Sequence, residues 1–193
     1  MKYLNLQKTK KNYAEGKNIT EFLRKEFMEK DNTSKIIEIA YDLQAGSYIE
    51  HTNLNRKRAE LYAHELASLL EPNLSQGSSL LDVGTGELTT LSLLLNQINI
   101  PLSEVFAFDI SWSRLYEGLR FYEKNCSKNI LKLHPFVADL YNIPLPSKSV
   151  DVTTSSHALE PNGGNLKNLL NELFRITKRK WVLSMSAKTT LTT

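Results

Sequence analysis

The stretch "LLDVGTGELTT", residues 80–90, indicates both the fold and the place where a ligand would lie. Its first residues are apolar apart from Asp82, which is the composition of a short strand buried on both faces. Gly84 and Gly86 follow, and a helical pattern begins directly after them. Glycines at the end of a strand allow a sharp turn and let the backbone approach a ligand closely. The stretch therefore predicts a strand, a ligand-binding loop and a helix, in that order.

The elements that follow this stretch predict an α/β fold. From residue 79 onward, short apolar runs typical of buried strands alternate with helical patterns. The expected strands cover residues 79–83, 105–110, 133–139, 149–156 and 181–187, and the expected helices cover residues 87–97, 111–125 and 165–178. Apolar strands that alternate with helices predict a doubly wound, mostly parallel sheet with helices on both faces. In such sheets, ligands bind outside the carboxyl ends of the strands.

The first part of the chain lacks this alternation and contains only helical patterns. The expected helices lie at residues 18–30, 34–46 and 55–72. Asn18 is expected to cap the first of them, and Gly46 to end the second. The lysine-rich residues 1–17 before them are expected to form a solvated arm. We therefore predict a helical lid over residues 1–76 and an α/β core over residues 77–193.

The composition argues against several classes of protein. A formal net charge of +3 is too small to indicate binding to long nucleic acids. Cys126 is the only cysteine, so no internal disulfide can form, which is typical of a reducing compartment. The chain shows neither the apolar centre of a signal peptide nor a run near the roughly 18 apolar residues that span a bilayer. We expect a soluble, cytoplasmic protein without nucleic-acid or membrane partners, and we predict no metal site.

The glycine loop has to be compared with the other loops that bind nucleotides. A dinucleotide-binding loop requires a third glycine where this chain has Thr89, and a phosphate-binding P-loop requires a Lys that is absent here. Asp82 stands two residues before the first glycine. A carboxylate there would repel a pyrophosphate but attract an ammonium group. The loop therefore favours a ligand with an amino-acid end, such as S-adenosylmethionine.

The ends of the next two strands are consistent with the same ligand. Asp109 ends the second strand, where a carboxylate can accept hydrogen bonds from both hydroxyls of a ribose. Ile110 can cover one face of an adenine ring. Asp139 follows the third strand and can accept from the adenine amino group, and Leu140 can pack on the ring.

Three segments together resemble one known family. "LLDVGTGELT" (80–89), "FAFDIS" (106–111) and "VADLYNIPLPSKSVDV" (137–152) are similar, in this order, to the sequences of class I S-adenosylmethionine-dependent methyltransferases. The resemblance covers roughly residues 79–187. It implies a Rossmann-like methyltransferase fold with S-adenosylmethionine as cofactor and S-adenosylhomocysteine as product. Many members carry another glycine where this chain has Leu88.

The resemblance extends upstream and raises a question at the end of the chain. "AYDLQAGSYIE" (40–50) is similar to the family's lid segment, which implies that Tyr41 and Tyr48 close over the cofactor. Packing of these rings onto the core is the alternative. The family sheet normally continues with two strands after the fifth, and this chain is expected to lack them. The exposed sheet edge could reflect truncation, could be filled by residues 2–7, or could pair with a second copy in a homodimer.

The acceptor side is less well determined by the sequence. "SSHALEPNGGN" (155–165) follows the fourth strand, where the family places residues beside the transferred methyl group. His157 and Glu160 are therefore candidate catalytic bases. Alternatively, the segment is a loop that enters the next helix, with Asn162 or Asn165 as its cap. We expect a methyltransferase that acts on a small molecule, such as a sugar or another metabolite. A catalytically inactive nucleoside-binding or interaction module is the alternative.

Overall fold

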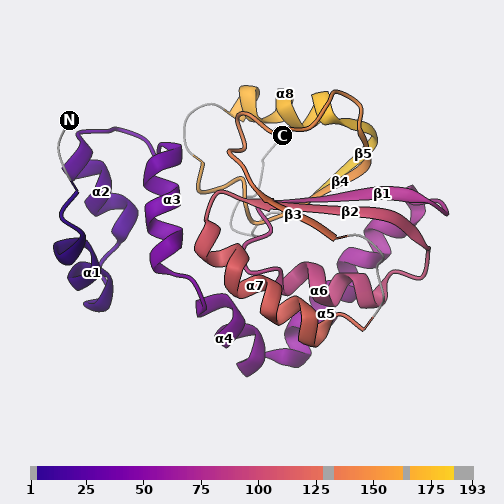
Figure 1. Cartoon of the computed structure of the whole chain (residues 1–193), viewed down its shortest axis with the longest axis horizontal. Helices are drawn as coiled ribbons and strands as arrows, with labels where there is room; N and C mark the ends of the chain where they lie inside the picture. Colours follow the sequence, from indigo (N-terminus) through magenta and orange to yellow (C-terminus); the bar gives the residue numbers. More distant parts are fainter. Residues whose placement is uncertain (1–3, 128–132, 163–165, 185–193) are drawn as a thin grey trace, which may run out of the picture.

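The computed structural model describes residues 4–127, 133–162 and 166–184, and a five-stranded sheet between helices forms its core (Figure 1). The strands are β1 (Ser78–Val83), β2 (Leu102–Asp109), β3 (Leu133–Val137), β4 (Val150–Ser156) and β5 (Thr177–Ser184). Their order across the sheet is β3-β2-β1-β4-β5, and each neighbouring pair is parallel. The predicted α/β fold is confirmed, and the carboxyl ends of β1, β2 and β4 lie side by side.

The helices fall into a core set and an N-terminal set. The core set comprises α5 (Arg56–Leu70), the 3₁₀ turn η1 (Glu71–Asn73), α6 (Thr89–Gln97), α7 (Trp112–Asn125) and α8 (Leu166–Ile176). The N-terminal set comprises α1 (Leu6–Ala14), α2 (Ile19–Phe27), α3 (Ser34–Leu43) and α4 (Ser47–Leu54). In Figure 1, α5, α6 and α7 cover one face of the sheet, α8 covers the other, and α1 to α3 lie beside the core.

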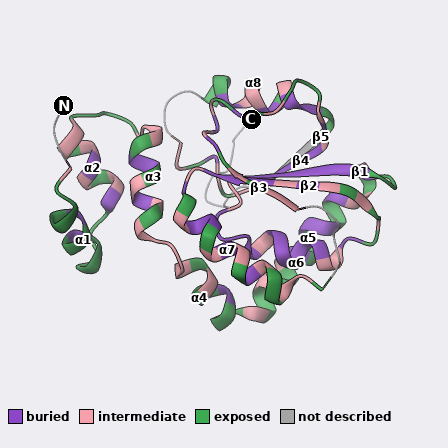
Figure 2. Ribbon diagram, viewed as in Figure 1, coloured by how far each residue is buried: buried purple, intermediate pink, exposed green. Residues whose placement is uncertain are grey.

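Alternation along β1 divides the apolar core into two clusters. Leu80 packs with side chains from α5 and α6 on one face of the sheet. Leu81 packs with side chains from α8 on the other face. Every residue of β1 is buried, and Figure 2 shows the exposed residues on the outer sides of the surrounding helices. The central strand therefore holds the loop that follows it on a rigid base.

Two expectations for the N-terminal part are wrong. The predicted arm contains α1, which is capped by Asn5, and Lys8 of this helix forms an ion pair of 2.6 Å with Glu26 of α2. Gly46 does not end the preceding helix, because α3 stops at Leu43. With its φ of 96°, Gly46 instead begins α4, a helix that the sequence pattern did not predict. By contrast, Asn18 caps α2 as predicted.

The last strand begins earlier than predicted. α8 ends at Ile176, and β5 starts directly at Thr177 instead of residue 181. The Thr177 hydroxyl donates a 2.6 Å hydrogen bond to the Leu173 carbonyl and so ends the helix. Within the described residues, β5 pairs only with β4, and the predicted strand residues after 184 lie outside this range.

No helix in the described ranges is both long and apolar enough to cross a membrane.

Helix α7 packs against the glycine loop at Gly118. A Cβ atom built on this residue would lie 2.6 Å from the carbonyl carbon of Glu87. We predict that Gly118→Ala lowers the free energy of unfolding by about 1–3 kcal/mol, because backbone must move to accept the methyl group. Urea unfolding measures this effect. Glu123→Ala on the exposed side of α7 is the matched control and should change stability by less than about 0.5 kcal/mol. Equal stability of the two variants would contradict the packing.

Candidate functional site

A hollow lies at the carboxyl ends of the central strands. Most of the residues predicted to bind the cofactor line it, and they come from the lid and from the ends of β1, β2 and β3. They are Tyr41, Tyr48, Gly84, Asp109, Ile110, Asp139 and Leu140. Sequence positions more than 90 residues apart thus meet at one place, as expected for a parallel sheet.

The glycine loop can adopt its conformation because of its two glycines. Gly84 and Gly86 have φ angles of 65° and 56°, in the left-handed region that other residues rarely adopt. A Cβ atom on Gly84 would lie 2.2 Å from the Cβ atom of Ala158, and one on Gly86 would lie 2.5 Å from the Arg114 guanidinium. Neither position has room for a side chain. The loop therefore brings its backbone close to the segment after β4.

Asp109 connects three parts of the site. Its two carboxylate oxygens accept hydrogen bonds of 2.9 Å from the backbone N–H groups of Gly86 and Ser111. The residue is 5% exposed and still lines the hollow. A carboxylate has about four acceptor positions, so capacity remains for the hydroxyls of a bound ligand.

The apolar side of the hollow lies beyond β2. Ile110, Ala138 and Leu140 line it together with Phe108. Asp139 accepts a 3.0 Å hydrogen bond from the backbone N–H of Tyr141, which fixes the turn after β3. The arrangement offers apolar surfaces for a flat ring and a carboxylate at its edge.

Asp82 is buried at the end of β1 and does not line this hollow. It is 6% exposed, and burial raises the pKa of its carboxyl to about 7, an effect that Thr85 opposes and Asp109 reinforces. Its predicted contact with an ammonium group stays a prediction.

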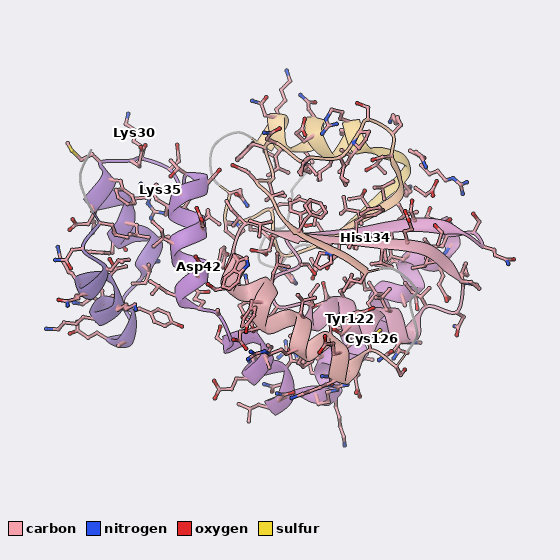
Figure 3. The ribbon with its side chains drawn as sticks, viewed as in Figure 1. Lys30, Lys35, Asp42, Tyr122, Cys126 and His134 are labelled. Carbon is pink, nitrogen blue, oxygen red and sulfur yellow. The ribbon has the colours of Figure 1, made fainter. Side chains whose placement is uncertain are left out.

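Hydrogen bonds fasten the lid at two points of the rim. On one side, Asp42 of α3 accepts a 2.6 Å bond from the Ser111 hydroxyl and a 3.3 Å bond from the Ser113 N–H, at the start of α7. On the other side, Asn32 donates a 2.9 Å bond to the Pro161 carbonyl in the segment after β4. In Figure 3, Asp42 lies on the side of α3 that faces the core. The lid therefore spans the hollow.

The two lid tyrosines contact a cation that the sequence analysis did not identify. The guanidinium carbon of Arg114 lies 4.9 Å from the ring centre of Tyr41 and 4.5 Å from that of Tyr48. Burial, and then the neighbouring Tyr48, raise the pKa of Tyr41 to about 12, which keeps its hydroxyl neutral. Arg114 also lies 3.5 Å from Glu87 of the glycine loop. One signal for this contact was present in the sequence. Arg114 and Gly118 are four positions apart on one helix, so they lie on the same face, and this face packs against the loop.

The predicted catalytic pair lies at the opposite side of the hollow. His157 Nδ1 is 3.3 Å from a carboxylate oxygen of Glu160, and its ring stacks at 6.0 Å on Tyr62. His157 has a φ of 57°, a backbone conformation that costs about 1–3 kcal/mol in a non-glycine residue. Asn162, considered above as a helix cap, donates its amide hydrogen to the Ala158 carbonyl instead. Asn165 lies outside the described residues.

A second hollow adjoins the first. The residues that line it come from α4, α5, the glycine loop and the start of α6. Both hollows are lined by Tyr48, Gly84, Arg114, Ser156 and His157. The two hollows thus meet at the glycine loop, beside the predicted catalytic His157. Within the described residues, no group of three or more His, Cys, Asp or Glu side chains is placed to hold a metal ion.

Comparison with known proteins identifies the family. Residues 81–183, more than half of the chain, match the family model described as a methyltransferase domain. The chain therefore belongs to the methyltransferase domain family. No curated protein sequence is significantly similar to the chain.

Solved structures show the same fold. One is a chain from the complex between the Haloferax volcanii Trm112 methyltransferase activator and a methyltransferase, with 21% identity and a TM-score of 0.55 over 72% of this chain and 55% of that one. An S-adenosylmethionine-dependent methyltransferase from Aquifex aeolicus has 28% identity and a TM-score of 0.50 over 63% of this chain and 61% of that one. The chain thus spans less than two thirds of these relatives.

The raised pKa of Asp82 predicts a dependence of stability on pH. The unfolded carboxyl titrates near 3.8 and the folded one near 7, so the folded chain keeps a proton that the unfolded chain loses. Stability therefore falls as the pH rises through this interval. Asp82→Asn removes the titrating group. We therefore expect the free energy of unfolding of this variant, minus that of the unaltered chain, to be larger at about pH 8 than at about pH 5. Urea unfolding of both proteins at the two pH values measures this difference. A difference that does not change with pH would contradict the raised pKa.

Proposed function

We propose that the chain is an S-adenosylmethionine-dependent methyltransferase that acts on a small molecule. The observation that carries this proposal is the single hollow in which Gly84, Asp109 and Asp139 meet at the ends of successive strands. These residues fit the parts of the cofactor. The glycine loop gives backbone access, and the oxygens of Asp109 retain acceptor positions for ribose hydroxyls.

The adenosine part of the cofactor also fits the hollow. Ile110 and Leu140 would cover the adenine faces, and Asp139 would accept from its amino group. Tyr41 and Tyr48 would close the lid side. When bound, S-adenosylmethionine supplies a methyl group on a positively charged sulfur that is open to attack by a nucleophile.

The second hollow supports a small acceptor. It meets the first hollow at the glycine loop beside His157, so a small acceptor held there would lie next to the cofactor.

The residues at the junction of the hollows would position the acceptor and handle its proton. His157 lines both hollows and has Glu160 at 3.3 Å, so its ring can take a proton that the carboxylate then balances. Alignment of acceptor and donor across this junction can supply about 7–11 kcal/mol of the rate acceleration in favourable cases. A nitrogen acceptor needs less help from a base than a hydroxyl does.

The proposal is tested first by calorimetry and then by group transfer. S-adenosylmethionine and S-adenosylhomocysteine should both bind to the purified chain. Methyl-labelled S-adenosylmethionine should then transfer label into the small-molecule fraction of a cell extract. Binding without any transfer would favour the alternative of an inactive nucleoside-binding module, and the absence of binding would remove the proposal.

Asp109→Ala should weaken S-adenosylhomocysteine binding by about 1.5–3 kcal/mol, because a charge-assisted pair of hydrogen bonds is lost. Titration calorimetry measures the change. Glu104→Ala is the matched control, because it removes an acid from the opposite end of the same strand. Unchanged affinity in Asp109→Ala would remove the ribose assignment.

The lid should become more ordered when the cofactor binds. We expect amide hydrogen exchange in α3 and α4 to slow in the presence of S-adenosylhomocysteine, because Tyr41 and Tyr48 line the hollow. Exchange in α1 serves as the internal control, since none of its residues lines the hollow. Equal exchange with and without the ligand in α3 and α4 would leave these helices as scaffold.

A further inference from the structure

Arg114 is a buried cation whose donors are not satisfied. Its side chain is 8% exposed. Among the residues that the structure describes, none accepts a hydrogen bond from the guanidinium, and its Nε atom is fully buried without a partner. The two tyrosine contacts involve ring faces, which do not use the N–H donors. The terminal N–H donors of the guanidinium are therefore available to a ligand in the hollows that Arg114 lines.

The neighbouring carboxylate does not meet this need. Glu87 is 1% exposed, and its Oε2 atom accepts a 2.8 Å hydrogen bond from the backbone N–H of Ile49 in the lid. Its Oε1 atom lies 3.5 Å from Arg114 Nε and has no hydrogen-bond partner. Buried charges are normally both paired and hydrogen-bonded. The Arg114 fork thus lacks the acceptor oxygens that its burial requires.

The surroundings of Arg114 contain groups of both charges: Arg58 and Glu87 line the second hollow, and Asp109 and Asp139 line the first. Arg114 lines both hollows. The second hollow also contains the start of α6, where Leu88 supplies no side-chain cap to the first-turn amides. Thr89, Thr90 and Arg58 border the same space. A helix N-terminus and a guanidinium fork both attract oxyanions, the fork in a bidentate manner.

We propose that Arg114 binds an anionic oxygen group, a carboxylate or a phosphate, of a ligand that occupies the paired hollows. The group has two sources. One is the carboxylate at the amino-acid end of S-adenosylmethionine, and the other is an anionic group of the methyl acceptor. This proposal rests on the proposed function for the identity of the methyl donor, S-adenosylmethionine. The binding of an anionic oxygen group by Arg114 does not depend on it.

The test compares Arg114→Met, which keeps the length of the side chain and removes the charge, with Arg120→Met. Arg120 lies on the same helix and stacks on the exposed Tyr116, so it is a matched control. Three probes are titrated: S-adenosylhomocysteine, 5′-methylthioadenosine, which lacks the amino-acid carboxylate, and inorganic phosphate with 5′-methylthioadenosine present.

Each source gives its own result. If the anion belongs to the donor, Arg114→Met weakens S-adenosylhomocysteine by about 10- to 100-fold and leaves 5′-methylthioadenosine unchanged. If it belongs to the acceptor, both nucleosides bind as before, and the phosphate binding seen with the unaltered chain is lost. Arg120→Met changes nothing in either case. An Arg114→Met variant that matches the unaltered chain with all three probes would overturn the proposal.

A measurement on the unaltered chain covers the case in which Arg114→Met does not fold. The Nε–H signal of Arg114 in a nitrogen NMR spectrum should shift when S-adenosylhomocysteine or phosphate is added, and not with 5′-methylthioadenosine alone. A signal that ignores all three probes would overturn the proposal. Failure of 5′-methylthioadenosine to bind would count against the proposed function instead, because this probe carries no anionic group for Arg114 to bind.

Discussion

The carboxylate of Asp109 holds the site together. One oxygen fixes Gly86 in the loop after β1, and the other fixes Ser111 at the cap of α7. Because the residue is almost fully buried, these charge-assisted bonds act where water does not compete with them. The relative position of loop, strand end and helix start thus depends on one side chain. The same side chain is the proposed ribose ligand, so structural support and recognition coincide.

The lid depends on this arrangement through Ser111. The Ser111 hydroxyl accepts a hydrogen bond from the backbone N–H of Arg114 and donates one to the Asp42 carboxylate of α3. The loop position set by Asp109 also places Glu87 where it accepts from Ile49. Both lid contacts on this side of the site are therefore attached to the same frame. The N-terminal helices have a small apolar cluster of their own, and these polar contacts orient it over the hollow.

Local and regular features could be predicted from the sequence. Strand composition, the glycine loop and the cap at Asn18 each depend on a few adjacent residues, and the structure has them. The fold followed because apolar strands alternating with helices allow few arrangements. The N-terminal helix α1 was missed because its polar sequence gives almost no apolar stripe, and tertiary ion pairs such as Lys8–Glu26 support it.

The site was only partly predictable for a related reason. Residues at strand ends meet by topology alone, so Asp109 and Asp139 could be assigned to one hollow in advance. Arg114 and Glu87 could not, because their contact depends on the packing of α7 against the loop and on the lid above them. In the same way, the spacing of Asp82 from the glycines did not reveal that the side chain would be buried and would not line the hollow.

The two fastenings of the lid differ in their number of hydrogen bonds, and this difference indicates a direction in which the lid would open. Asp42 accepts two hydrogen bonds at the start of α7, whereas Asn32 donates one to the Pro161 carbonyl. An opening that begins at the single bond would swing the lid about the start of α7 and would widen the hollow on the β4 side. A ligand would then enter and leave past His157.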